Sequence, residues 1–589
     1  MQEISAYVTR KEFSATATGE LTDEYIDESL HICILSNLSV KASKIAFLYR
    51  EAGEGFVENV PPETAFILHD KHLLRTIFGT DQFAVKPLFY SLQSGKLMVH
   101  SNLNDLLFFS ENKEVNVRKT VDYFKWESDD LPADNQTFYK DIFRLLPAQT
   151  GFFSDNTLTF DSKDTLSEKT PLLTGNEVVQ NFRTAFEDSV AMRKVNRPAA
   201  ANLSGGLDSS SVVGVLSSQT NRKLTTIYFD AQKSEADERK FAKCVAEKHQ
   251  TDHREVTAPK SLFGSLISVT EKIAQPDPGI LPSFIHEVVF EEIERENINY
   301  LYSGHGGDNI TGYGLEFLDD LFRSKQWGSL KKQAKKYDDL RFNDESISGT
   351  LFKREIKRAV QQKAFFQAVK LGFICLFYFG IVPLPIMYNP FRKRIRIPDY
   401  KRIESRLLKI KASVGLKEHQ TFILSNLPDS FTKDQRKHLD FAYIRLAING
   451  NETLTTLGHY RDTGVSFPFF DRELLGVSVQ ATNQQKFGDG HLRGTLRNAL
   501  NDYLPEKVKT RVSKADFTSA ALMYFGLLYE DFRREFPLDH DLWRIVDAHV
   551  FQEIVDVIED EQFTPQQKVK HTWLAMRVIN FGIFLNTVG

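Results

Sequence analysis

Apolar residues follow two different patterns along the chain. From residue 1 to about 165, short apolar runs alternate with turns, as in the strand-like run 64–68 and in 79–90, where a turn leads into a strand. After a polar linker at 162–176, apolar side chains recur at helical spacing, at Val178, Val179, Phe182, Phe186 and Val190. The contrast predicts one domain over 1–165 and a second over 175–589.

The second domain has the pattern of strands that alternate with helices. Strand candidates lie at 201–203, 225–229 and 300–302, and helical spacing follows the first two. This order is typical of a doubly wound parallel sheet, whose ligands bind at the carboxyl ends of the strands. Residues 315–440 are mostly helical in pattern. We therefore expect an α/β fold with helical additions.

The first of these strands runs into the loop Ser204-Gly205-Gly206-Leu207-Asp208-Ser209-Ser210-Ser211. The two glycines let backbone N–H groups approach an anion, and the serines open a helix whose unpaired N–H groups and dipole attract phosphate. The loop lacks the lysine of a Walker A motif. A carboxylate beside a phosphate requires a cation between them, so Asp208 implies Mg²⁺. The alternative is an ordinary loop with Asp208 as a helix cap.

Composition narrows the classes of function. The chain has 589 residues, of which 41% are hydrophobic and 26% charged, as in globular proteins of two or three domains. A net charge of −4 gives no reason to expect a nucleic acid as partner. The three cysteines are far apart and have no zinc-ligand spacing. No secretory signal follows Met1, so we expect a cytoplasmic protein with access to ATP.

One uncharged segment stands out at 371–391. It is long enough for a membrane span, with Lys370 before it and a basic cluster after it. Prolines at 383, 385 and 390 interrupt its second half, which favours a buried helix or a surface for a hydrophobic partner. The alternative is peripheral contact with a membrane.

The loop resembles the pyrophosphate-binding loop of the ATP pyrophosphatases, which split ATP between the α and β phosphates and transfer AMP. The later run Ser303-Gly304-His305-Gly306-Gly307-Asp308 resembles the Ser-Gly-x-Gly-x-Asp motif of the asparagine synthetase family. The resemblance implies that Asp208 and Asp308 bind one Mg²⁺. It assigns ATP binding to Leu203, Ser204, Gly205, Gly206, Asp208, Ser209, Ser210, Phe229 and Gly304. For Phe229, expected beside the adenine, a plain core aromatic is the alternative.

The N-terminal domain is similar to the glutamine amidotransferase domain of the same family. The similarity rests on Asp-x-Phe-x-x-Lys-Pro-Leu-Phe-Tyr at 81–90, on 97–102 and on 142–149. In glutamine-using members the nucleophile is a cysteine exposed when Met1 is removed, and this chain has Gln2 there. A glutaminase needs that thiol together with its own α-amine. We therefore expect an Ntn-type glutaminase-like α+β sandwich without glutaminase activity, which scaffolds or binds a partner.

Two further positions carry roles implied by the resemblance. Pro468-Phe469-Phe470-Asp471 resembles the family's Pro-Phe-Leu-Asp, although Ser466 replaces the usual arginine before it. Residues 511–517 match the C-terminal signature, in which Lys514 would stabilise charge on the acyl-adenylate; a surface lysine is the alternative. His305 fills the variable position of its motif. It would act as general base toward an amine, or it merely hydrogen-bonds the turn.

The missing N-terminal cysteine, His305, the 511–517 ending and the divergent region 315–440 look most like the lasso peptide cyclases. The resemblance implies an ATP- and Mg²⁺-dependent ligase that adenylates a carboxylate of a precursor peptide and closes a macrolactam with the N-terminal amine of its core. It also implies a leader peptidase and a leader-binding partner. The alternatives are a β-lactam synthetase-like or ammonia-dependent amide synthetase, or a non-catalytic nucleotide-binding scaffold.

Overall fold

The computed structural model describes most of the chain. The described residues are 1–9, 12–110, 112–162, 171–173, 175–232, 237–279, 283–341, 346–381, 397–411, 431–512 and 517–588. The predicted linker lies partly outside them, so the predicted domain boundary stays a prediction.

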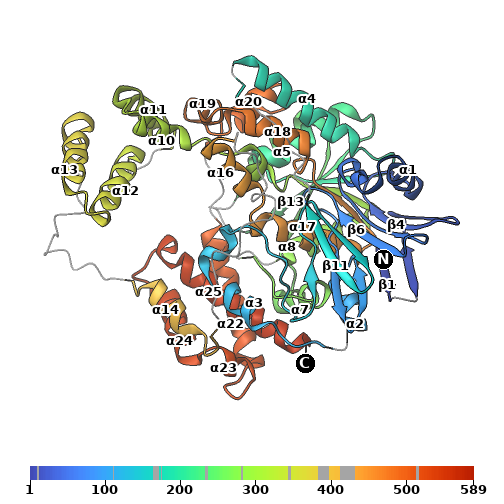
Figure 1. Ribbon diagram of the computed structural model, residues 1–589. Helices are drawn as coiled ribbons and strands as arrows, with labels where there is room; N and C mark the ends of the chain where they lie inside the picture. Colours follow the sequence, from blue (N-terminus) through green and yellow to red (C-terminus); the bar gives the residue numbers. More distant parts are fainter. Residues whose placement is uncertain are drawn as a thin grey trace.

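Two antiparallel sheets pack face to face in the N-terminal domain (Figure 1). The first has the order β2-β1-β8-β7-β9 and is formed by β1 (Glu3–Val8), β2 (Phe13–Thr18), β7 (Phe89–Gln93), β8 (Lys96–His100) and β9 (Phe143–Arg144). The second has the order β11-β10-β6-β5-β4-β3 and is formed by β3 (Thr22–Ile26), β4 (Leu30–Ser36), β5 (Thr64–Asp70), β6 (Arg75–Thr80), β10 (Gln149–Ser154) and β11 (Thr157–Ser162).

Side-chain alternation explains the sandwich. Ile4, Ala6 and Val8 of β1 are buried at every second position, and they pack against Ile67 and Phe78 of the other sheet. Helix α1 (Ala42–Ala52) covers the outer face of the second sheet. The predicted α+β sandwich is therefore confirmed. The strand expected at 64–68 lies within β5, and the turn expected after residue 79 leads to β7.

The second domain is built on a parallel sheet of the order β14-β13-β12-β15-β16. Its strands are β12 (Ala200–Asn202), β13 (Thr225–Asp230), β14 (Asp252–Thr257), β15 (Tyr300–Tyr302) and β16 (Gly464–Ser466). The helices between and before these strands are α4 (Asn176–Met192), α5 (Leu207–Gln219), α6 (Arg239–His249), α7 (Leu262–Ile273) and α8 (Phe284–Arg295). The chain runs outward from β12 in one direction and then from β15 in the other. The β12–β15 junction is therefore the switch point where ligands bind in such sheets.

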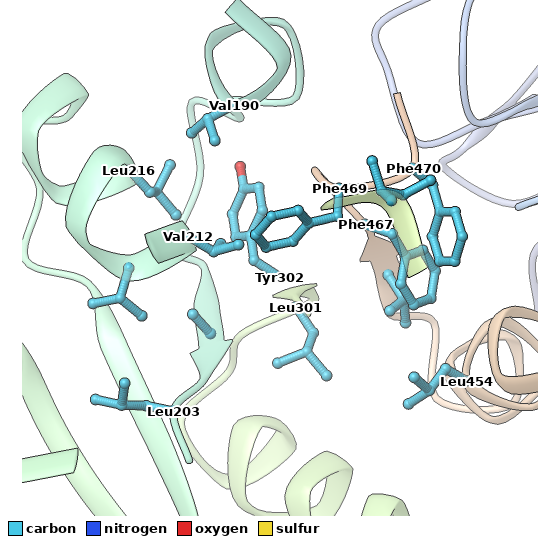
Figure 2. Packing of buried hydrophobic residues seen from close by; sticks show 14 of the residues in the cluster. Val190, Leu203, Val212, Leu216, Leu301, Tyr302, Leu454, Phe467, Phe469 and Phe470 are labelled. Carbon is cyan, nitrogen blue, oxygen red and sulfur yellow. The ribbon is translucent and has the colours of Figure 1, made fainter. Parts of the chain in front are cut away.

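The core around this junction is aromatic on one side and aliphatic on the other. Figure 2 shows Tyr302 and Leu301 of β15 between Val212 and Leu216 of α5 and the phenylalanines that follow β16. Phe467, Phe469 and Phe470 of that segment are all fully buried. The run Pro468–Asp471, noted for its resemblance, thus packs against the strand that carries the second glycine motif.

Helices make up the rest of the chain. From residue 307 to 459 the structure has α9 (Gly307–Thr311), α10 (Glu316–Arg323), α11 (Trp327–Arg341), α12 (Ile347–Gln361), α13 (Phe365–Phe373), the π-helical turn η4 (Ile374–Tyr378), α14 (Tyr400–Leu407), α16 (Lys433–Ala442) and α17 (Arg445–His459). After β16 come α18 (Arg472–Gln480), α19 (Asn483–Phe487), α20 (Gly494–Ala499), α21 (Glu506–Lys509), α22 (Thr518–Glu535), α23 (Leu542–Ile545), α24 (Ala548–Glu559) and α25 (Pro565–Val588). Figure 1 shows α11 to α13 at one side, away from the sheets.

The uncharged segment 371–391 is described only as far as residue 381. Leu371 and Cys375 are buried in the core of these helices, whereas the rings of Phe373 and Phe377 stack on each other and are 58% and 76% exposed. The prolines of the segment lie outside the described residues. Within the described part of the chain, every helix is too short or too polar to cross a bilayer.

A buried ion pair joins the two domains. Glu63, just before β5, accepts hydrogen bonds from Arg193 Nε (2.7 Å), Ser466 Oγ (2.9 Å) and the Phe467 N–H (2.8 Å), and both charged side chains are fully buried. Burying two charges costs free energy that further hydrogen bonds must offset. Ser466, which stands where the family usually has an arginine, contributes one of those bonds and so belongs to the domain junction.

Candidate functional site

The glycine-rich loop after β12 is held tightly against α6. Gly205 has φ +76°, and a Cβ there would lie 2.6 Å from the Ala242 backbone nitrogen, so only glycine fits. The hydroxyl of Ser204 accepts the Gly206 N–H at 3.2 Å. Helix α5 then begins at Leu207 with Gly206 as its N-cap, and no side chain caps it. The first N–H groups of α5 are thus available to an anion.

Asp208 is not a helix cap. It lies in the first turn of α5, and its carboxylate points to the loop that follows β15. In that loop a Cβ on Gly304 would lie 2.6 Å from the Ser209 backbone nitrogen, and one on Gly307 would overlap the Asp208 carboxylate. The two glycine motifs therefore pack directly on each other at the switch point.

Arg493 brings the two predicted metal ligands together. Its Nη2 donates to Asp208 Oδ1, its Nη1 donates to Asp308 Oδ1 at 2.7 Å, and its Nε donates to Thr311 Oγ1 at 2.9 Å. Burial alone would lower the pKa of Arg493, but the two carboxylates raise that pKa above its usual value. Both carboxylates thus face one position, and that position now holds a guanidinium.

This arrangement fits a divalent cation. Asp208 and Asp308 supply hard oxygen donors, they follow the carboxyl ends of adjacent parallel strands, and the glycines let the two motifs approach closely enough for both carboxylates to share one position. Near them, the buried hydroxyl of Ser210 has no hydrogen-bond partner among the described residues. The donor chemistry therefore suits Mg²⁺, with a phosphate beside it at the start of α5.

A cavity of about 530 Å³ opens beside this pair. Ser204, Gly206 and Asp208 line one side of it, and the other walls carry four arginines, Arg341, Arg493, Arg497 and Arg511. Burial, together with the neighbouring Arg493 and Arg341, lowers the pKa of Arg497 to about 10. Such a concentration of cations next to a helix N-terminus attracts a polyanion.

Three of these arginines are held by carbonyl or carboxylate oxygens. Arg341 donates to the Gly490 carbonyl at 2.8 Å, and Arg497 donates to the carbonyls of Leu492 (2.9 Å) and Arg511 (2.8 Å). Arg511 pairs with Glu238 and lies over the ring of Phe241, 4.1 Å from its centroid. The arginines are thus fixed before any ligand binds. Arg341 belongs to α11, so the divergent helical region contributes a wall of the site.

His305 lies next to this site but is held by another element. Its Nε2 is 2.9 Å from the Ala447 carbonyl oxygen of α17, and its ring packs near Phe470. Burial lowers the pKa of His305 below 6.5, and the bond to Ala447 opposes that shift. The imidazole is therefore neutral at neutral pH, with its proton on Nε2 and Nδ1 able to accept another.

The structure does not place Phe229 or Lys514 in the cavity wall. Phe229 is the next-to-last residue of β13 and packs against two of the hydrophobic cores, and it is not among the described residues that line the cavity. Lys514 lies outside the described residues, although Val512 and Phe517, on either side of 513–516, line the cavity. The role of each stays a prediction.

Sequence reasoning assigned no role to the arginines of the site, although Arg511 belongs to the signature 511–517. Arg493 has φ +54° at the N-cap of α20, and nothing in its surrounding sequence indicates that its side chain reaches two aspartates 185 and 285 residues away. Arg341 lies in a helix whose polar pattern is that of an ordinary solvent-exposed surface. The only local signal was the number of arginines between 493 and 511.

Family comparisons cover both domains. A model of the asparagine synthase family matches residues 181–379 and 456–581, and a model of a glutamine amidotransferase domain matches 41–163. The first match includes both glycine motifs and the Pro-Phe-Phe-Asp run. The second covers most of the N-terminal sandwich.

Three curated relatives show the extent of the similarity. Amidase chyE of Penicillium rubens is 27% identical over 343 residues, which are 53% of this chain and 48% of that protein. Amidase chry2 of Gibberella zeae is 25% identical over 46% of this chain and 43% of its own length. The glutamine-hydrolyzing asparagine synthetase 2 of Bacillus subtilis is 21% identical over 46% of this chain and 38% of its own length. The chain spans about half the length, or less, of these relatives.

Proposed function

Because this chain belongs to the asparagine synthase family, we propose that it is an ATP-dependent ligase that activates a carboxylate as an acyl-adenylate and converts it to an amide. One observation carries the proposal. Asp208 and Asp308 face a single cation position at the switch point of the sheet, beside an uncapped helix N-terminus and a cavity lined by arginines. This is the arrangement needed to hold a metal-bound triphosphate.

In the first step, formation of the acyl-adenylate, different residues of the site have different roles. A carboxylate is a poor electrophile, and attack of its oxygen on the α-phosphorus of ATP releases pyrophosphate and yields a mixed anhydride. The loop 204–209 and the N-terminus of α5 would bind the departing pyrophosphate through backbone N–H groups. Arg341 and Arg497 would offset its charge from the opposite wall. Asp208 and Asp308 would hold Mg²⁺, which neutralises charge on phosphate oxygens when bound.

In the second step an amine attacks the acyl carbon and AMP leaves. We assign the proton transfer from that amine to His305 Nδ1 and the stabilisation of the developing oxyanion to Lys514. His305 belongs to the same loop motif as Asp308, and Lys514 belongs to the signature 511–517, of which the described residues Arg511, Val512 and Phe517 line the cavity. AMP, not phosphate, is the product that distinguishes this route from a kinase-like activation.

The only cysteine of the N-terminal domain is unsuited to be a glutaminase nucleophile, which supports the proposal that the amine comes from the substrate. This cysteine, Cys33, lies within β4, where burial and then Glu24 raise the pKa of the thiol to about 12. A glutaminase nucleophile needs a thiol of lowered pKa. We therefore propose that glutamine is not the nitrogen donor, and that the acceptor amine belongs to the molecule that is activated.

The substrate we propose is a short precursor peptide, whose Asp or Glu side chain is joined to the N-terminal amine of its core. A leader peptidase and a leader-binding partner would act with the enzyme. Two other substrates compete with this proposal. One is an aspartate-like acid with free ammonia, and the other is a small molecule whose own amine closes a ring, as in a β-lactam synthetase. The same site geometry serves all three.

A peptide panel tests this proposal. Purified protein is incubated with ATP, Mg²⁺ and synthetic core peptides that carry Asp or Glu seven to nine residues from a free amine. We expect pyrophosphate release that depends on the peptide, and a product lighter than the peptide by one water. N-terminally acetylated peptide is the matched control, because it can be adenylated but not cyclised. Amide formation from aspartate and ammonium instead would refute the peptide substrate but not the ligase.

Replacing His305 with glutamine tests its assignment as general base. We expect single-turnover amide formation to fall about 10²-fold while acyl-adenylate formation persists. Because burial lowers the pKa of His305, the wild-type rate should stay level above pH 6.5 and fall at lower pH, where Nδ1 becomes protonated. The variant should lack this decline. If its pH profile matches the wild type, His305 only holds α17 through Ala447.

A further inference from the structure

Three side chains converge where the N-terminal strand β1 meets the end of α17. Glu3 lies in β1, Asp105 lies in α2 (Leu103–Phe109), and His459 ends α17 of the second domain. His459 Nε2 is 3.9 Å from Asp105 Oδ2 and 4.0 Å from Glu3 Oε2, and the three potential ligand atoms all lie within 4.8 Å of one another. None of these three residues belongs to the switch-point site, and no step of the proposed reaction uses them.

Two buried atoms of this cluster have no hydrogen-bond partner among the described residues. They are Nε2 of His459, whose side chain is only 6% exposed, and Oδ2 of Asp105. Leaving a buried polar atom unpaired costs about 1–3 kcal/mol. His459 Nε2 and Asp105 Oδ2 lie 3.9 Å apart, so one group that binds a nitrogen and an oxygen together would satisfy both atoms.

The other nitrogen of His459 is already oriented. Nδ1 lies 2.8 Å from the carbonyl oxygen of Gln2, to which it donates in one tautomer, and it accepts the Gln2 N–H at 3.0 Å in the other. In the tautomer that donates Nδ1–H to the carbonyl, the lone pair of Nε2 faces Glu3 and Asp105. Metal-binding histidines commonly use this kind of backbone bond to fix the ring.

His100 lies beside Glu3. Its Nδ1 accepts the Asn102 N–H at 3.0 Å, so its proton is on Nε2, which lies 3.9 Å from Glu3 Oε2. Burial lowers the pKa of His100 to about 4 and also lowers the pKa of His459. Burial and then the neighbouring Asp105 raise the pKa of Glu3.

We propose that Glu3, Asp105 and His459 bind one Zn²⁺ ion that fastens the N-terminal sandwich to α17. An imidazole with two carboxylates suits a borderline first-row ion better than Mg²⁺ or Ca²⁺, which prefer oxygen ligands alone. Ligand atoms around tetrahedral Zn²⁺ stand about 3.4 Å apart, so closing the observed separations needs only small side-chain movements. A fourth position is left for water.

A second cluster in the same domain provides a matched control. Glu24, His31 and Cys33 also lie close together, but His31 Nε2 is already 2.7 Å from Glu24 Oε1, and all three belong to β3 and β4. An ion there would not connect the two domains. His31→Gln therefore removes a histidine from a comparable carboxylate cluster without touching the proposed site.

The test measures Zn²⁺ bound to the full chain after treatment with EDTA and dialysis into buffer with excess Mg²⁺. We expect one Zn²⁺ per chain by calorimetry and elemental analysis, and a rise in the midpoint of thermal unfolding on adding Zn²⁺. His459→Gln should weaken Zn²⁺ binding at least about tenfold and abolish the thermal shift, whereas His31→Gln and Asp208→Asn should keep both. Glu3→Gln, at a partly exposed position, gives the same test if His459→Gln does not fold. Equal Zn²⁺ binding by wild type, His459→Gln and Glu3→Gln, or no binding by the wild type, would overturn the proposal.

Discussion

Asp208→Asn is expected to reduce substrate-dependent pyrophosphate release by about 10³-fold, equivalent to about 4 kcal/mol of transition-state stabilisation. The amide has the shape of the carboxylate and can still accept the hydrogen bond from Arg493. What it removes is one of two negative charges that face the cation position. The loss should therefore appear in the chemical step, and the fold should be retained.

The measurement is pyrophosphate release at saturating ATP and Mg²⁺ with the active peptide, alongside thermal unfolding. Asp308→Asn should have an effect of similar size, because its carboxylate meets the same guanidinium from the other motif. Asp339→Asn is the control, since that carboxylate pairs with Lys335 on the exposed surface of α11. An Asp208→Asn enzyme that kept a tenth of the wild-type activity would show that the two aspartates do not hold the catalytic metal.

The parts of the site predicted from sequence are those with a local physical reason. The strand expected at 225–229 is β13, and the one at 300–302 is β15. Buried parallel strands give continuous apolar runs, and a glycine motif must follow where two loops pack without room for a Cβ. These rules place both glycine motifs where parallel strands end at one edge of the sheet, and the family resemblance implied that Asp208 and Asp308 share an ion. The structure brings the two carboxylates onto one guanidinium.

The features that could not be predicted from the sequence depend on contacts between residues that are far apart in the chain. The Glu63–Arg193 pair, the Arg493 bridge and the meeting of Glu3 with His459 each join residues more than 100 positions apart. Polar residues in such contacts have no periodicity that distinguishes them from residues on a solvated face. Ser466 is an example. The sequence showed that a serine replaces the arginine expected at this position, but it did not show that the serine hydroxyl donates a hydrogen bond to Glu63.

The bridge formed by Arg493 changes what is expected of the metal site. A guanidinium between the two carboxylates offsets their charge, and it occupies the position that Mg²⁺ would need. If the aspartates hold Mg²⁺, as we propose, the ion would compete with Arg493, whose guanidinium would then turn toward the cavity and toward a bound phosphate. Arg493 would thus act as a built-in counter-ion that is replaced when the substrate arrives.

Arg493→Gln is expected to destabilise the protein without added Mg²⁺ by about 1–3 kcal/mol, because it removes the guanidinium that two half-buried carboxylates share. Millimolar Mg²⁺ without nucleotide should restore much of this loss, since the variant no longer has a competing guanidinium. The wild type should respond to Mg²⁺ far less. Thermal unfolding with and without Mg²⁺ measures both effects.

Arg497→Gln is the matched control, because the Arg497 guanidinium binds only backbone carbonyls among the described residues. Its loss should therefore give no Mg²⁺ response. If Arg493→Gln and the wild type gain equally from Mg²⁺, the ion binds elsewhere, and the guanidinium has no part in controlling it.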